Sequence, residues 1–92
     1  MLSDTNGIKV LIADDNREFC GILKDYFSNE PDFELVGVCS NGMEVLEILE
    51  KQEVEVLILD LIMPYMDGIG VLEKINELNL PTDLKIIILT AF

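Results

Sequence analysis

Four short apolar segments, distributed along a chain of 92 residues, constrain the fold more than any other feature of this sequence. Three of them have no alternation of apolar and polar positions, and β-branched residues are frequent in them. Strands with one face in water alternate, whereas strands covered on both faces do not. The pattern therefore predicts a sheet covered by helices on both faces. The segments are Lys9–Ala13, Phe33–Cys39, Val56–Leu59 and Lys85–Phe92, and the second, which contains Glu34 and Gly37, is expected nearer an edge.

Three helical patterns lie between the apolar segments, each with apolar residues at helical spacing. The order is β-α-β-α-β-α-β, which predicts a parallel sheet with right-handed crossovers. The boundary signals are Pro31, a capping-box pattern of Asn41 and Glu44, the turn Asp67-Gly68, and Pro81. The predicted inner faces are Phe19, Ile22, Leu23, Tyr26 and Phe27 in the first helix, Val45, Leu46, Ile48 and Leu49 in the second, and Leu72, Ile75 and Leu78 in the third.

The composition restricts the environment and the partners of the chain. Eighteen acidic residues against six basic ones give a net charge of −12, which repels phosphate backbones and disfavours direct binding of nucleic acid. The N-terminus lacks the features of a signal peptide, and no apolar run reaches the roughly eighteen residues of a membrane span. Cys20 and Cys39 lie in apolar surroundings and are interpreted as reduced core residues. We therefore expect a cytoplasmic protein without membrane contact.

Polar side chains stand where three of the predicted strands end: Asp14 and Asp15, Asp60, and Thr90. Ligands of parallel α/β sheets bind at this edge. If the strand order is 2-1-3-4, the three carboxylates converge. Two like charges about 4 Å apart repel by about 4 kcal/mol at an effective dielectric constant of about 20. A divalent cation would reverse that repulsion, and a small set of oxygen ligands favours Mg²⁺.

A carboxylate beside Mg²⁺ can act as a nucleophile on a phosphoryl group, and the Thr90 hydroxyl could donate a hydrogen bond to a phosphoryl oxygen. Other roles are open for each residue taken alone. Asp14, Asp15 and Asn16 could cap the first helix, and Thr90 could be an ordinary strand residue. Asp67 is better explained as a cap, and Met63 and Met66 as packing residues. The co-occurrence of these groups on one side of the sheet favours the site.

The segments VLIADDN, LILDLIMPYMDGIGVLE and IIILTAF together resemble the receiver domains of bacterial two-component response regulators. The resemblance covers residues 8–92 and implies a flavodoxin-like (CheY-like) doubly wound parallel sheet. It further implies that Asp60 is the phosphoacceptor and that Asp15, assisted by Asp14, binds Mg²⁺ together with Asp60. The backbone carbonyl of Ile62 would complete the metal ligands, and Thr90 would bind the phosphoryl group.

The resemblance also implies a function. Such receivers catalyse their own phosphorylation from a phosphohistidine donor, either a histidine kinase or a histidine phosphotransferase, and are signalling domains and not turnover enzymes. ADDNREF and MPYMDGIGVLE are most similar to receivers of sporulation-initiation regulators in spore-forming bacteria. This similarity implies a phosphorelay that switches a downstream transcription-factor domain.

The family pattern continues beyond the last apolar segment, with a fifth strand that ends in a lysine and with further helices. None of these is in the sequence, and Lys85 stands at the wrong end of its strand. We therefore expect residues 1–92 to be a receiver that is incomplete at its C-terminus, with a DNA-binding domain further along the chain. An open fourth strand would also allow a dimer with exchanged strands.

Two other functions remain open from the sequence. The fold could serve as a protein interaction module that works without phosphate. A small α/β phosphohydrolase with an aspartate nucleophile is the third hypothesis, but such enzymes place a second aspartate two residues after the first. Here that position is Ile62, which cannot act as an acid or base.

Overall fold

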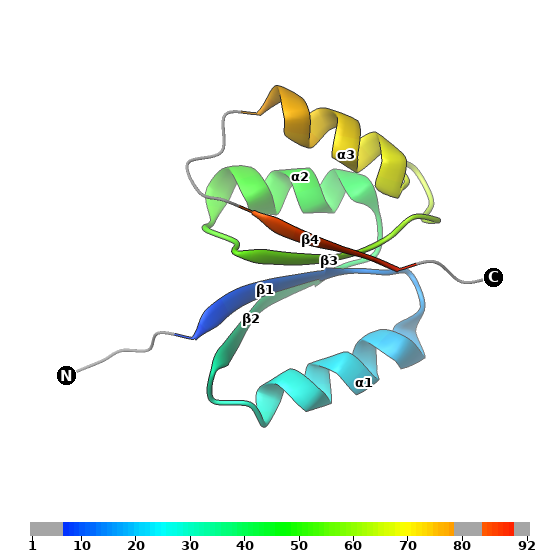
Figure 1. Cartoon of the computed structure of the whole chain (residues 1–92). Helices are drawn as coiled ribbons and strands as arrows, with labels where there is room; N and C mark the ends of the chain where they lie inside the picture. Colours follow the sequence, from blue (N-terminus) through cyan, green and yellow to red (C-terminus); the bar gives the residue numbers. More distant parts are fainter. Residues whose placement is uncertain (1–6, 79–83, 90–92) are drawn as a thin grey trace.

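A computed structural model of the chain describes residues 7–78 and 84–89. The predicted alternation of strands and helices is confirmed (Figure 1). Strand β3 includes Asp60 as its last residue. The predicted last strand reaches Leu89, while residues 90–92 and Pro81 lie outside the described part of the chain. The elements are β1 (Ile8–Ala13), α1 (Arg17–Ser28), β2 (Phe33–Cys39), α2 (Gly42–Lys51), β3 (Val56–Asp60), α3 (Gly68–Glu77) and β4 (Lys85–Leu89).

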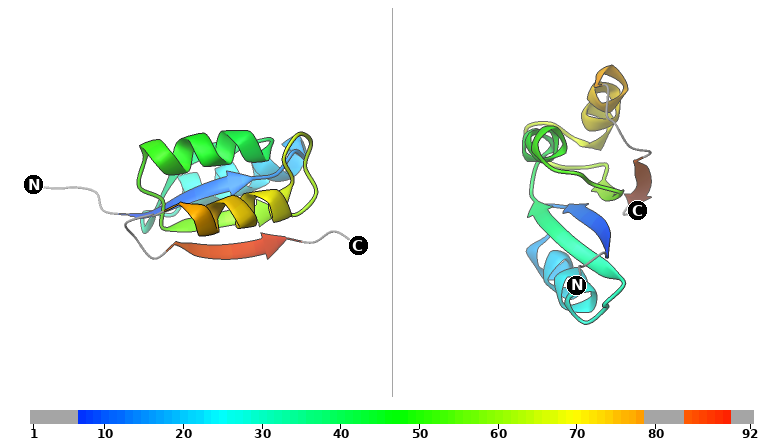
Figure 2. Two further views of the ribbon diagram at one scale, coloured as in Figure 1. Left: turned by 90° about the horizontal axis from the view of Figure 1, so that it is seen from above. Right: turned by 90° about the vertical axis from the view of Figure 1, so that its left-hand side faces the viewer.

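The four strands form one parallel sheet in the order β2-β1-β3-β4, as predicted. Helix α1 covers one face, and α2 with α3 covers the other, so the sheet lies between two helical layers (Figures 1 and 2). Among the described strands, β2 and β4 are the two edges, and Ile87 and Ile88 of β4 are exposed. Strand exchange through this edge stays a prediction. None of the helices within the described residues is long and apolar enough to cross a membrane.

Strand β1 shows why the apolar segments do not alternate. Val10 and Ile12 pack on the α1 side, whereas Leu11 and Ala13 belong to the larger cluster on the α2 and α3 side. All four are at most 1% exposed. Burying a side chain of the size of Val, Leu or Ile contributes about 1.5–3 kcal/mol, so β1 anchors both layers.

Both cysteines are free and buried, which confirms their interpretation as core residues. Cys20 faces β1 from α1, and Cys39 ends β2 within the opposite cluster. Burial raises the pKa of the Cys39 thiol to about 12. This thiol is therefore protonated and unreactive at neutral pH.

The predicted inner face of α1 is partly wrong. Ile22 and Tyr26 are 66% and 55% exposed, while Cys20 is buried and Leu23 and Phe27 pack against its cluster. Positions 20, 23 and 27 follow helical spacing, and Ile22 is rotated about 100° away from Leu23 because each residue advances the helix by that angle. The five predicted residues form a stripe wider than the surface that α1 covers.

The faces of the other two helices agree better with prediction. In α2, Val45 and Leu49 are buried, and Leu46 and Ile48 pack against the same cluster. In α3, Leu72 and Ile75 pack against the cluster around the fully buried Val71, and Leu78 is the C-cap residue. The predicted caps are also present, because Asn41 accepts the Glu44 N–H and Asp67 accepts the Gly70 N–H.

Tyr65, in the loop between β3 and α3, is the non-glycine residue with positive φ among the described positions, at 67°. The left-handed backbone conformation costs a residue with a side chain about 1–2 kcal/mol, and asparagine tolerates this conformation better than tyrosine. The Tyr65 side chain is 91% exposed, so it contributes little packing in return.

Tyr65→Asn is expected to raise the free energy of unfolding by about 1 kcal/mol, because it relieves this backbone strain. Urea unfolding followed by circular dichroism measures the change. Tyr65→Phe keeps a ring at the same backbone angle and should match the wild type, and equal stability of the two variants would contradict the explanation.

Candidate functional site

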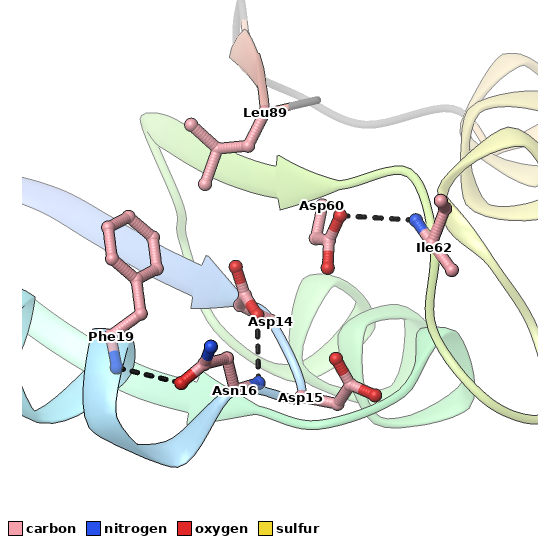
Figure 3. Close-up of a pocket in the computed structure, with 7 residues that line it drawn as sticks. All are labelled: Asp14, Asp15, Asn16, Phe19, Asp60, Ile62 and Leu89. Carbon is pink, nitrogen blue, oxygen red and sulfur yellow. Dashed lines mark hydrogen bonds between the residues drawn. The ribbon is translucent and has the colours of Figure 1, made fainter. Parts of the chain in front are cut away.

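The carboxyl ends of β1 and β3 lie side by side, because Ala13 pairs with Leu59 in the parallel register. Asp14 and Asp15 follow β1 directly, and Asp60 is the last residue of β3. Figure 3 shows the three side chains around one pocket. One carboxylate oxygen from each lies within 4.8 Å of the others. The convergence predicted from the strand order is confirmed.

Asp14 is the most buried of the three, at 8% exposed. Its backbone N–H donates to the carbonyl of Cys39 (3.0 Å), and its Oδ1 accepts the N–H of Asn16 (2.8 Å). Desolvation raises the pKa of the Asp14 carboxyl; the Asn16 hydrogen bond partly offsets this, and the charges of Asp60 and Asp15 raise it further. The negative charge of Asp14 is therefore disfavoured in the absence of a cation.

Asp60 is only partly buried, and its side chain points into the pocket toward Asp14 and Asp15 (Figure 3). Its Oδ1 accepts the N–H of Ile62 at 3.1 Å. The Ile62 residue is exposed and lines the same pocket. The role predicted for the Ile62 carbonyl as a metal ligand stays a prediction.

The pocket has a volume of about 540 Å³. Among the described residues that line it, none carries a positive charge. Phe19, Ile62 and Leu89 provide its apolar part, and Asp14, Asp15, Asn16 and Asp60 provide its polar part. Phe19 and Leu89 were not predicted as site residues, although Phe19 lies one helical turn after the aspartate pair.

The capping question at the start of α1 is decided by Asn16. Its side-chain oxygen accepts the N–H of Phe19 at 3.0 Å, so Asn16 is the N-cap. Asp14 and Asp15 are therefore available to the pocket. Asp67 caps α3 and does not line the pocket, and Met63 is buried in the core, as predicted.

Thr90 lies outside the described residues, but its neighbour Leu89 pairs with Asp60 and lines the pocket. The carboxyl end of β4 therefore borders the site. Lys85 pairs with Val56 at the opposite end of the sheet, which agrees with the expectation that Lys85 cannot reach Asp60.

The chemistry of the donor set fits a hard divalent cation. Its charged ligands are all carboxylate oxygens, and the pocket leaves room for water or for oxygens of a second group. Burial raises the pKa of Asp14, and the charges of Asp60 and Asp15 raise it further; the repulsion among these charges would become attraction to a shared cation. Asp14, Asp15 and Asp60 are the residues that would hold it.

Residues 10–92 match the response regulator receiver domain family. The chain belongs to this family. The receiver is similar to the RcsB response regulator of Salmonella typhimurium, with 31% identity and a TM-score of 0.77. It is also similar to the receiver domain of Francisella response regulator 1452, with 31% identity and a TM-score of 0.80, and to the response regulator domain of Thermotoga maritima CheB, with 28% identity and a TM-score of 0.82.

These likenesses extend over 94% of this chain for RcsB and response regulator 1452 and 92% for CheB. The chain spans 44%, 68% and 61% of those three chains, respectively. The CheY-like fold predicted from the sequence is confirmed. Receiver domains are signalling domains and not turnover enzymes, which agrees with the expectation from sequence.

The loop between Asp60 and α3 closes tightly on the end of β3 in this receiver. The Gly68 N–H donates to the carbonyl of Leu61 at 3.0 Å. A Cβ atom at Gly68 would lie 2.6 Å from the backbone oxygen of Asp60 and 2.7 Å from the Cα of Leu61. Since backbone atoms cannot rotate away, only glycine fits without displacing the strand end that carries Asp60.

Gly68→Ala should therefore lower the free energy of unfolding by about 1–3 kcal/mol through overpacking. The matched control is Gly21→Ala, at an exposed position of α1 where an added Cβ meets nothing within 4 Å. The control should raise the free energy of unfolding by about 0.5–1 kcal/mol, because alanine favours a helix over glycine. Chemical denaturation measures both, and equal effects of the same sign would refute the steric explanation.

The raised pKa of Asp14 predicts a pH dependence of stability in the metal-free receiver. Below the ordinary value of 3.8 the carboxyl is protonated in both the folded and the unfolded chain. As the pH rises through the higher folded pKa, the folded state must ionise a disfavoured group, so its contribution to stability is lost. Asp14→Asn removes this decline, whereas Asp25→Asn, on the exposed face of α1, should keep it.

Urea unfolding in EDTA at a series of pH values above 3.8 tests this dependence. A decline that is as steep in Asp14→Asn as in the wild type would show that other groups cause it.

Proposed function

We propose that this receiver accepts a phosphoryl group on Asp60 in a Mg²⁺-dependent reaction and that the modification switches its surface near the end of β4. The convergence of three carboxylates from β1 and β3 at one pocket is the observation that carries this proposal. A structural role explains it poorly, because clustered like charges reduce the stability of the fold.

The family resemblance assigns the role of nucleophile to Asp60, and the position of Asp60 in the pocket is compatible with that role. Asp60 ends β3, which like β1 is an internal strand of the sheet, and it lines the pocket. Asp14 is more buried and its backbone and carboxylate are held by Cys39 and Asn16. Asp14 and Asp15 therefore serve as cation ligands, and the carbonyl of Ile62 is proposed as a further ligand.

The proposed step transfers a phosphoryl group from a phosphohistidine. A carboxylate oxygen of Asp60 attacks phosphorus, the P–N bond to the donor imidazole breaks, and the electron pair of that bond leaves with the imidazole nitrogen. The product is an aspartyl phosphate, a mixed anhydride. When bound, Mg²⁺ supplies charge neutralisation for the phosphoryl oxygens. The Thr90 hydroxyl is proposed to donate a hydrogen bond to one of these oxygens.

A wider role is proposed from one of the similar structures. One RcsB structure is of two dimers bound to two parallel DNAs, and this chain is 31% identical to that protein while spanning 44% of its chain. We propose that the receiver likewise controls a DNA-binding domain elsewhere in its protein, with a histidine kinase or phosphotransferase as donor. The segments ADDNREF and MPYMDGIGVLE support a role in sporulation control.

Phosphorylation is tested with acetyl phosphate and intact-mass spectrometry. With Mg²⁺, the wild type should gain the mass of one phosphoryl group, and with EDTA it should gain none. Asp60→Asn should remain unlabelled because it lacks the nucleophilic oxygen. Asp67→Asn keeps an N-cap side chain outside the pocket and should be labelled like the wild type.

Equal labelling of Asp60→Asn and the wild type would show that another residue accepts the phosphoryl group. No labelling of the wild type, together with binding of a partner that needs no Mg²⁺, would favour the phosphate-independent interaction module. Repeated turnover of a chromogenic phosphomonoester would favour the phosphohydrolase, although the residue two positions after Asp60 is the apolar Ile62.

A further inference from the structure

The thiol of Cys20 contacts the backbone of Asp14, one of the three residues of the acidic site. Cys20 lies in the first turns of α1, is 7% exposed, and faces β1. Its Sγ donates a hydrogen bond to the backbone carbonyl of Asp14 at 3.2 Å. A thiol is a weak donor, but here the bond is buried, where a lost partner is costly.

This bond completes a set of contacts that fixes the Asp14 residue from three directions. The Asp14 N–H donates to Cys39 O at 3.0 Å, its Oδ1 accepts Asn16 N–H at 2.8 Å, and its carbonyl accepts the Cys20 thiol. Cys20 is itself tied to the same turn, because its N–H donates to Asn16 O at 3.0 Å. The connection between β1 and α1 therefore has little freedom to rotate.

We propose that Cys20 is a positioning residue, which holds the peptide between Asp14 and Asp15 through the Asp14 carbonyl and thereby directs both carboxylates toward Asp60. The carbonyl of Asp14 belongs to the peptide group that joins the two aspartates. The orientation of that group sets ψ of Asp14 and φ of Asp15, and these angles together determine where the two side chains lie relative to each other. The proposal rests on the proposed function only for its effect on cation binding.

A purely structural role is the competing explanation, since Cys20 also packs with Val10, Ile12 and Ile58. The two explanations differ in what restores the site. Serine and alanine are nearly equal in size, and only serine can donate to the Asp14 carbonyl. The packing of the core depends on the size of the side chain at position 20, whereas the positioning of Asp14 depends on whether that side chain can donate a hydrogen bond. Cys20→Ala and Cys20→Ser therefore form a matched pair.

The first measurement is made without metal by nuclear magnetic resonance. The carbonyl ¹³C shift of Asp14 reports its hydrogen bond, and exchange of the Asn16 amide reports the orientation of the Asp14 carboxylate. Cys20→Ala should move the ¹³C shift and speed amide exchange by about three- to tenfold, the worth of one hydrogen bond. Cys20→Ser should stay close to the wild type.

The second measurement is calorimetric titration with Mg²⁺. Cys20→Ala should weaken the affinity by about three- to tenfold, and Cys20→Ser should restore it. Val10→Ala opens a cavity in the same cluster without touching the site, so it should lose stability and keep its affinity. If Cys20→Ala does not fold, Cys20→Val and Cys20→Thr pose the same comparison, since only threonine retains a donor.

The proposal is overturned if serine and alanine at position 20 behave alike, or if Val10→Ala shifts the affinity as much as Cys20→Ala does. A wild type that binds no Mg²⁺ would instead contradict the proposed function. In that case the metal-free shifts of Asp14 and the exchange of Asn16 still decide whether Cys20 positions the turn.

Discussion

Repulsion among carboxylates at the end of one strand pair is the constraint on which the site depends. The register that joins Val10–Ala13 to Val56–Leu59 is enforced by buried side chains on both faces of β1. While the strands stay paired, that register keeps the backbones of Asp14 and Asp60 close together at the same end of the sheet. Apolar burial thus holds the charges together. A cation that binds only the folded state would therefore increase the stability of the protein.

Backbone donors reduce this repulsion in the same way on both strands. In Asp14 and in Asp60, Oδ1 accepts the N–H of the residue two positions on, at 2.8 Å and 3.1 Å. Such Asx turns place no requirement on the side chain of the donating residue, because the donor is its backbone N–H. Each carboxylate thereby uses one oxygen locally, and its other oxygen is left to the pocket (Figure 3). The turns orient the ligands before any cation arrives.

The sheet and the acidic cluster could be predicted because both follow from simple rules: strands covered on both faces do not alternate, and parallel strands end on one rim. The buried face of α1 could not be predicted in the same way, since its five apolar residues form a stripe wider than the surface available. In the structure Cys20 is buried, whereas Ile22 and Tyr26 are exposed. Geometry alone also does not separate a nucleophile from a ligand. The role given to Asp60 came from the family resemblance.

The link between β3 and β4 is where a charge added at Asp60 would act first. Leu61, the next residue, donates its N–H to Leu89 O at 3.4 Å, whereas the bond from Asp14 N–H to Cys39 O, which joins the ends of β1 and β2, is 3.0 Å. The longer bond is the weaker one. A phosphoryl group would add negative charge beside the weaker connection, while β1 stays fixed by its buried side chains. The proposed phosphorylation of Asp60 would therefore displace β4 more readily than β1.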